Sequence, residues 1–192
     1  MALKVSNNIK ESIHFEGEEH LIEAAKLDPS QFRVLYEKYF KRIFVFIYHR
    51  VEDRDLASDL TSQVFLKAMQ RINQFTSRGL PFSSWLFRIA VNECNDYFRK
   101  TKRSKMVYVD DTSFHHLFEE MFLEDPQSQL EKKLHLVLER LKPDELQIIE
   151  LRFFEGMPFQ MVAEILGISE VYAKVRTYRI LDKMKKIFLK LL

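Results

Sequence analysis

The sequence has little of what disulfide-rich or β-rich proteins need. Its 192 residues include one Cys, four Gly and five Pro. The single Cys94 excludes an intramolecular disulfide framework and a cysteine-based zinc site, and is typical of a reducing compartment. So few glycines and prolines leave little turn chemistry for β-hairpins. We therefore expect a cytoplasmic, all-α protein.

Long apolar runs are also missing. The longest, IFVFIY at residues 43–48, is flanked by Arg42 and Arg50 and is far shorter than the ~20 residues that cross a bilayer. Residues 1–17 have neither a continuous apolar core nor a small-residue cleavage site, so we expect a polar lead-in rather than a secretory signal. No membrane insertion is expected.

What the chain does contain is helical periodicity, with 46% hydrophobic residues. We predict two small helical domains, at residues 18–103 and 126–192, joined by an acidic and aromatic linker at 104–125. Asp28 is the expected N-cap of a helix with Pro29 at its first position. The core-facing stripe of that helix is expected to contain Phe32, Leu35, Tyr36, Tyr39, Ile43 and Phe46. The next helix should bury Leu56, Leu60, Val64 and Ala68.

Charge is segregated along the chain although the net charge is only +2. Residues 99–105, RKTKRSK, carry five basic and no acidic side chains, whereas residues 106–125 carry six acidic side chains and no Lys or Arg. Residues 174–190 carry seven basic side chains against Asp182 alone. Two basic patches favour two contacts with a polyanion. Solvated helix ends are the alternative explanation, because the helix dipole favours cations there.

The segment MVAEILGISEVYAKVR, residues 161–176, predicts a helix-turn-helix. Ala163 allows close helix approach, Gly167 can adopt the positive φ that ends a helix, and Ser169 can cap the next one. An ordinary antiparallel helix pair is the alternative. The second helix should pack through Ala173, Thr177, Ile180, Met184, Ile187 and Leu191.

The other face of that second helix is suited to DNA. Tyr172, Lys174, Arg176 and Arg179 are available for phosphates or base edges. Val171, Val175 and Tyr178 form an apolar strip at steps of four and three residues. This strip could contact thymine methyl groups, contact a protein, or widen the core face, and the sequence leaves these possibilities open.

With both halves in view, the chain resembles an extracytoplasmic-function (ECF, group IV) RNA polymerase sigma factor. FRVLYEKYFKRIFVFI, DLTSQVFLKAM and FSSWLFRIAVNECNDYFRKTKR resemble the helices of sigma region 2. LERLKPDELQIIELRFFEGMPFQMVAEILGISEVYAKVR resembles region 4. The resemblance implies a subunit that binds core polymerase through its clamp helices and flap, and that recognises a minus-35 duplex and a single-stranded minus-10 element. It also implies an anti-sigma factor as a partner.

The resemblance and the residue chemistry together give three sets of candidate residues. The minus-35 set is Ser169, Glu170, Val171, Tyr172, Lys174, Val175, Arg176, Tyr178 and Arg179. The minus-10 set combines aromatic faces, polar readers and basic backbone contacts: Asn73, Gln74, Phe75, Ser77, Arg78, Phe82, Arg88, Asn92, Asn95, Arg99, Lys100, Lys102 and Arg103. Of the aromatic residues near the loop at 73–85, Trp85 and Phe87 are expected in the core. For Phe75 and Phe82 the sequence does not decide between core packing and stacking on a base.

The polymerase-binding set lies on the helix DRDLASDLTSQVFLKAM: Asp55, Asp59, Leu60, Ser62, Gln63, Phe65 and Lys67. The family usually has Asp-Leu-x-Gln-Glu there, and Ser62 and Gln63 replace the Gln-Glu pair. The family often has Gly-Thr-Val after Ile-Ser-Glu, where this chain has Val171, Tyr172 and Ala173. The tip of the reading helix is therefore bulkier and more apolar, which predicts a promoter preference that differs from the family norm.

Two other functions fit parts of the pattern. A self-sufficient helix-turn-helix regulator would bind an operator without polymerase, and a helical adaptor or anti-sigma-like protein would use its basic tails only incidentally. An enzyme is not expected, because no glycine-rich phosphate loop, His-Glu-x-x-His pattern or nucleophile-base set is present. We expect no catalytic residue, no cofactor and no metal site; the adjacent His115 and His116 would point about 100° apart on a helix.

Overall fold

The regular structure of the described residues consists of helices. The computed structural model describes residues 18–77, 79–101, 117, 120–121 and 131–191, and the chain divides into two compact units, Met1–Met106 and Val107–Leu192. The predicted all-α class with two helical domains is confirmed. None of the described helices is long and apolar enough to cross a membrane.

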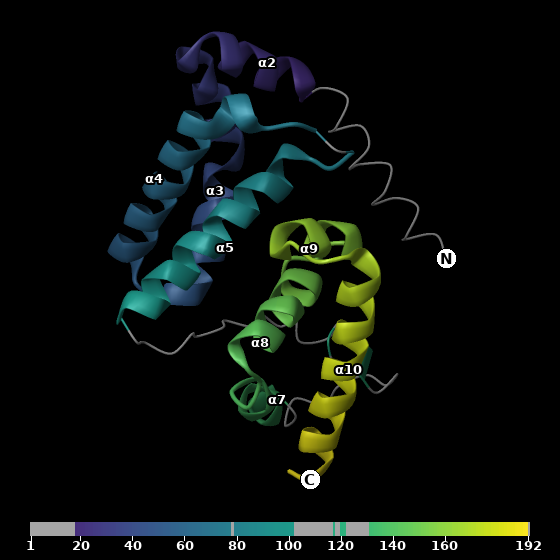
Figure 1. Cartoon of the computed structure of the whole chain (residues 1–192). Coiled ribbons are helices and arrows are strands. Elements are labelled where there is room, and N and C mark those ends of the chain that lie inside the picture. Colours follow the sequence, from purple (N-terminus) through teal and green to yellow (C-terminus); the bar gives the residue numbers. More distant parts are fainter. Residues whose placement is uncertain (1–17, 78, 102–116, 118–119, 122–130, 192) are drawn as a thin grey trace. The chain divides into compact units, whose positions relative to one another are not determined.

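The first unit is built on three long helices. Helices α3 (Phe32–Val51), α4 (Arg54–Arg71) and α5 (Phe82–Thr101) pack on one another, and the short α2 (Glu19–Leu27) packs on α3 (Figure 1). Two 3₁₀ turns, η1 (Pro29–Gln31) and η2 (Ile72–Gln74), lie before α3 and after α4. Asp28 is the predicted cap, but it opens η1 instead of α3, because its carboxylate accepts from both the amide and the hydroxyl of Ser30.

The predicted stripes account for most of the first unit's core. The stripe of α3 is buried as predicted except for Tyr36, which is exposed and lies with its ring edge-on against Phe65 at 4.8 Å between centroids. On α4, Leu60, Val64 and Ala68 are buried and Leu56 is half-buried. Both departures lie at the margin of a helix face, where spacing alone does not fix burial.

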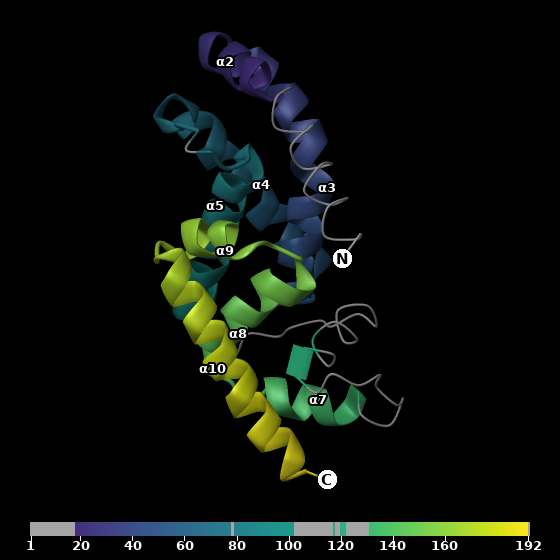
Figure 2. The same cartoon turned by 90° about the vertical axis from the view of Figure 1, so that its right-hand side faces the viewer.

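The second unit contains α7 (Glu131–Leu138), α8 (Pro143–Ile149), η4 (Glu150–Phe154), α9 (Phe159–Leu166) and α10 (Glu170–Leu189). Both views show α10 passing α9, α8 and α7 (Figures 1 and 2). After α8 the helix widens into a π-helical turn at η4, where the Glu155 amide donates to the Glu150 carbonyl at 3.0 Å. Such a turn depends on one inserted residue, which apolar spacing does not reveal.

The core of the second unit includes residues from the predicted linker. Leu117 and Met121 are buried in one cluster with side chains of α7, α8 and α10. On α10, Ala173, Thr177, Ile180 and Met184 are buried as predicted, while Ile187 and Leu191 are half-buried. Part of the 104–125 segment therefore belongs to this core; Glu120 is exposed, and the other residues of the predicted linker lie outside the described residues.

Candidate nucleic-acid interface

The second unit contains the predicted helix-turn-helix. Helix α9 ends at Gly167, which has a φ of 68° in the left-handed region. The Ile168 amide then donates to the Ala163 carbonyl at 3.0 Å, which closes the turn. Helix α10 begins after Ser169, whose Oγ accepts from the Tyr172 amide at 3.2 Å. Only glycine adopts this φ without strain, and a serine at the N-cap satisfies a free amide, so the turn follows from these two residues.

The outward face of α10 carries an apolar ridge, which we define as Val171, Val175 and Tyr178. Their side chains are 74%, 44% and 45% exposed. Phe159 of α9 lies against the Tyr178 ring, with 6.3 Å between centroids. The possibility that these three residues widen the core face is therefore excluded. Lys174 and Arg179, also exposed, lie on either side of this ridge by helical position.

The flank of α10 nearest to α8 is held by acidic side chains. The guanidinium of Arg176 donates from Nη1 to the Tyr172 hydroxyl at 2.9 Å and from Nη2 to Asp144, the second residue of α8. Further along, Lys183 Nζ lies 2.5 Å from Glu145 Oε2. Arg176, predicted to be open to DNA, therefore has two partners within its own unit.

Electrostatics reinforce the second of these ion pairs. Burial raises the pKa of the Glu145 carboxyl, but hydrogen bonds from Lys183 and from the Lys142 amide outweigh burial and hold that pKa below its ordinary value. Glu145 therefore stays ionised and keeps α10 attached to α8.

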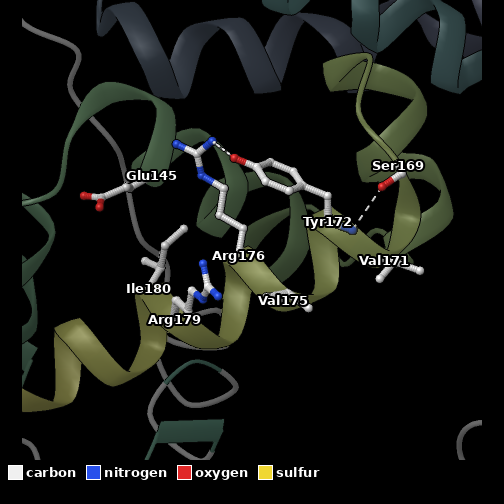
Figure 3. A pocket seen from close by; sticks show the side chains of 8 residues that line it. All are labelled: Glu145, Ser169, Val171, Tyr172, Val175, Arg176, Arg179 and Ile180. Carbon is white, nitrogen blue, oxygen red and sulfur yellow. Dashed lines mark hydrogen bonds between the residues drawn. The ribbon is translucent and has the colours of Figure 1, made fainter.

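A pocket of about 490 Å³ lies between this flank and the start of α10 (Figure 3). Figure 3 shows Arg176 and Tyr172 extending together, with Arg179 and Val175 directed elsewhere from the helix. The lining residues are Glu145, Ser169, Val171, Tyr172, Val175, Arg176, Arg179 and Ile180. All but Glu145 and Ile180 belong to the predicted minus-35 set, so the structure brings most of that set together; Glu170, at the first position of α10, is exposed beside it.

In the first unit, helix α5 carries the polar part of the predicted minus-10 set. Arg88, Asn92 and Arg99 are exposed and Asn95 is half-buried, and these four follow one another at steps of four, three and four residues. They therefore share one face of the helix. Arg99 pairs with Asp96 at 3.0 Å. Among the described residues, the Asn95 Oδ1 atom is buried without a hydrogen-bond partner.

The loop before α5 gives a different result from the one expected. Phe75 and Phe82 are 7% and 1% exposed, and with Trp85 they form a triangle of rings whose centroids lie 5.1 to 5.4 Å apart. Trp85, expected in the core, is instead half-buried. The prediction that Phe75 and Phe82 offer open faces to a base does not hold in this arrangement. The three rings pack against one another, and spacing along the sequence does not predict this contact.

The remaining minus-10 candidates divide between loop and tail. Asn73, Gln74 and Lys100 are exposed and Ser77 is half-buried. Arg78, Lys102 and Arg103 lie outside the described residues.

Helix α4 presents the predicted polymerase-binding residues on two different faces. Asp55, Asp59, Ser62 and Gln63 are exposed, whereas Leu60 and Phe65 are buried. The half-buried Lys67 points to α5, where its Nζ lies 2.5 Å from Glu93 Oε1. Leu60 and Phe65 therefore belong to the core in this structure, and Lys67 joins α4 to α5.

The outward face of α4 also carries an exposed apolar side chain that was not predicted. Leu66 follows Ser62 by four residues and is exposed. Continuing the spacing of Asp55, Asp59 and Ser62 along the helix would have found it.

Sequence reasoning also missed a buried carboxylate that supports α5. Glu18 is 3% exposed; it accepts from the Tyr39 hydroxyl, from Lys38 Nζ at 2.7 Å and from the Phe82 amide at 3.1 Å. Burial, together with the hydrogen bond to Glu18, raises the pKa of Tyr39, so its hydroxyl remains a donor. Glu18 thereby ties the start of α5 to α3. The partners lie 20 to 64 positions away in sequence, and no local signal marks them.

Comparison with known proteins gives two family matches, one in each half of the chain. The model of Sigma-70 region 2 matches residues 35–104, and that of Sigma-70, region 4 matches residues 137–186. The ECF RNA polymerase sigma factor BldN of Streptomyces coelicolor is 30% identical over 172 residues, which are 87% of this chain and 64% of BldN. The sigma factor SigV of Bacillus subtilis is 30% identical over 135 residues, covering 70% of this chain and 77% of SigV.

A solved structure agrees in fold. The sigma factor RpoE of Bartonella quintana, in complex with the anti-sigma factor NepR, superposes with a TM-score of 0.56 at 19% identity, over 81% of this chain and 95% of that chain. A region 2 followed along the chain by a region 4 defines an RNA polymerase sigma factor. The chain belongs to the ECF sigma factors, and its function is promoter-specific transcription initiation. These matches do not favour a stand-alone regulator.

Proposed function

We propose that this sigma factor reads a promoter in two places while bound to core RNA polymerase. Helix α10 would enter the major groove of the minus-35 duplex, and the outward face of α5 would hold one strand of the minus-10 element. The observation that carries the proposal is the exposed outer face of α10: it begins at a capped helix end and has Lys174 and Arg179 on either side of an apolar ridge. This arrangement suits entry into a polyanionic groove.

For the minus-10 element we propose a polar reading surface on α5. Arg88, Asn92 and Arg99 share its outward face, and Lys100 lies exposed beside them. Amide side chains can hydrogen-bond the edges of unpaired bases, and the cations can hold the backbone. Asn95 supports this assignment, since its buried Oδ1 is an acceptor with no partner among the described residues. Asn73, Gln74 and Ser77 would extend the surface onto the loop.

For core polymerase we propose the outward face of α4. Asp55, Asp59, Ser62 and Gln63 lie there with the exposed Leu66. An apolar centre with a polar rim is typical of a protein interface. Leu60 and Phe65 would act from beneath by holding α4 against α3. The flap of polymerase would bind the second unit, as the family resemblance implies.

We also propose an anti-sigma factor as a partner, because RpoE of Bartonella quintana was solved with one. Such a partner would restrain the chain by covering the polymerase-binding or DNA-binding faces. The chain would act in the cytoplasm, where its DNA and polymerase are, and would catalyse no reaction of its own. The domain limits that go with this function follow the two compact units, Met1–Met106 and Val107–Leu192, because Leu117 and Met121 of the predicted linker pack in the second core.

Run-off transcription with purified core polymerase and a genomic promoter library tests the proposal. Transcripts from promoters that share an upstream two-part element are expected. Replacing Asn92 and Arg99 by Ala should lower promoter opening, measured by reactivity of unpaired thymines, without changing the position of the upstream contact. Replacing exposed Glu23 of α2 by Ala provides a matched control. Duplex binding of equal strength without polymerase would contradict the proposal and favour a stand-alone regulator.

A further inference from the structure

The apolar ridge of α10 is an unusual surface for a helix that enters a DNA groove. Val171, Val175 and Tyr178 follow one another at steps of four and three residues, so they form one line along the helix. They lie opposite the buried residues Ala173, Thr177 and Ile180. The middle of the exposed face is therefore apolar, and the cations lie only at its sides.

One of the two arginines predicted to contact DNA from α10 already has partners within its own unit. Arg176 uses Nη1 for the Tyr172 hydroxyl and Nη2 for Asp144. A bidentate contact to guanine O6 and N7 needs two donors side by side, so this contact would compete with the bonds that Arg176 already makes. Asp144 also places a negative charge next to the site. The flank facing α8 is therefore a poor guanine reader.

The charges around the ridge point to duplex DNA as its occupant. Lys174 and Arg179 are exposed on its two sides, and no ion pair of either residue is seen within the part of the chain that the structure describes. Two cations on either side of an apolar line match a groove whose walls are phosphates and whose floor carries an apolar group. In the major groove that group is the C5-methyl of thymine, since the other base edges present donors and acceptors.

We infer that the apolar ridge reads thymine methyl groups in the minus-35 element, with Val171 and Val175 as the closest contacts and Tyr178 held in place by Phe159. Lys174 and Arg179 anchor the neighbouring phosphates and add no sequence preference. This inference rests on the proposed function, in which α10 enters the minus-35 duplex. It adds the chemical class of the bases that are recognised.

Replacing deoxythymidine by deoxyuridine tests the inference, because this change removes only the methyl group. The complete chain is assembled with core polymerase on a promoter identified by run-off transcription, and each minus-35 thymine is replaced in turn. Burying one methyl is worth about 0.8 kcal/mol, so each contacted position should lose about four-fold in affinity. Replacing a cytosine of the same element by 5-methylcytosine, at a position next to the ridge, should raise affinity.

Two variants assign the effect to the ridge. With Val175→Ala, at least one position should no longer distinguish thymidine from deoxyuridine. With Lys174→Gln, the matched control one residue away, affinity should fall equally for both bases. The substitution series itself uses the unaltered chain, so it does not depend on how a variant folds.

The outcomes separate the two proposals. A holoenzyme that needs its minus-35 duplex but binds thymidine and deoxyuridine equally at every position would overturn the methyl reading alone. A minus-35 element without thymine on either strand would do the same. A holoenzyme whose transcription ignores the upstream sequence altogether would overturn the proposed function of α10, and the methyl reading with it.

Discussion

The two faces proposed to contact DNA are constructed in opposite ways. On α5 the outward residues are polar, and the rings of Phe75 and Phe82, before and at the first residue of the helix, are buried in the core. On α10 the outward residues are apolar, and ion pairs at the flank attach the helix to α8. The α5 face therefore depends on the packing of its own unit, whereas the α10 ridge can be altered with little effect on folding.

The strongest test of this comparison is Phe82→Ala. Removing a ring that is 1% exposed should lower the free energy of unfolding of the first unit by about 3–5 kcal/mol. Urea unfolding followed by the fluorescence of Trp85, the single tryptophan and a neighbour of this ring, measures the loss.

The matched control is Val171→Ala on the ridge, which should change stability by less than about 0.5 kcal/mol. If Phe82→Ala had normal stability but lost recognition of the minus-10 element, Phe82 would stack on a base instead of supporting the core.

The next effect in size comes from the buried carboxylate of Glu18 at the start of α5. Glu18→Ala should destabilise the first unit by about 1–3 kcal/mol, because the Tyr39 hydroxyl and the Phe82 amide lose their acceptor. Glu18→Gln keeps an acceptor oxygen and should lose less. The same fluorescence-detected unfolding measures both, and equal losses for the two variants would show that charge, not hydrogen bonding, governs this site.

The sequence predicted the elements whose causes are local. Gly167 and Ser169 define the turn and the start of α10, and the apolar spacing identifies its buried face. The sequence was a poorer guide to contacts between residues that lie far apart along the chain. The ring triangle of Phe75, Phe82 and Trp85 and the pairing of Arg176 with Asp144 join separate elements, and neither leaves a periodic signal.

On α10 the sequence therefore predicted which residues face outward, but not what each of them contacts. The composition of its outward residues could be read from the sequence, as could the unusual Val171 and Tyr172. The sequence could not show which of the cations is paired within the protein, because Asp144 lies 32 positions from Arg176. Burial of Phe65 on α4 likewise depends on the aromatic rings of α3, and only tertiary packing distinguishes it from the exposed Asp59 and Ser62.

A smaller effect distinguishes open cations from the paired one on α10. Lys174→Gln and Arg179→Gln should each reduce the slope of log affinity against log salt by about 0.9, since each removes one phosphate contact. Arg176→Gln should change the slope less, because Arg176 is already paired with Asp144. Holoenzyme binding to promoter duplex between low and moderate salt measures all three. An equal change for Arg176 would mean that DNA displaces Asp144 from it.

The smallest expected effect concerns pH and the attachment of α10 to α8. The pKa of Glu145 is lower in the folded chain than in the unfolded chain. Ionised Glu145 therefore stabilises the fold fully at a pH above its unfolded-state pKa, and this stabilisation is lost as the pH falls through its folded-state pKa. Lys183→Met should cost at most about 1 kcal/mol near neutral pH. The cost should disappear in acid, once Glu145 is protonated in both proteins.

Hydrogen exchange of the α8 and α10 amides, compared at neutral and acidic pH, isolates the second unit for this measurement. Lys186→Met, at an exposed position of the same helix, is the matched control and should show no such pH dependence. If the cost of Lys183→Met persisted in acid, the packing of the lysine stem rather than its ion pair would attach α10 to α8. The flank of α10 would then depend on apolar packing, as α5 does, and the contrast between the two faces would be confined to their outward residues.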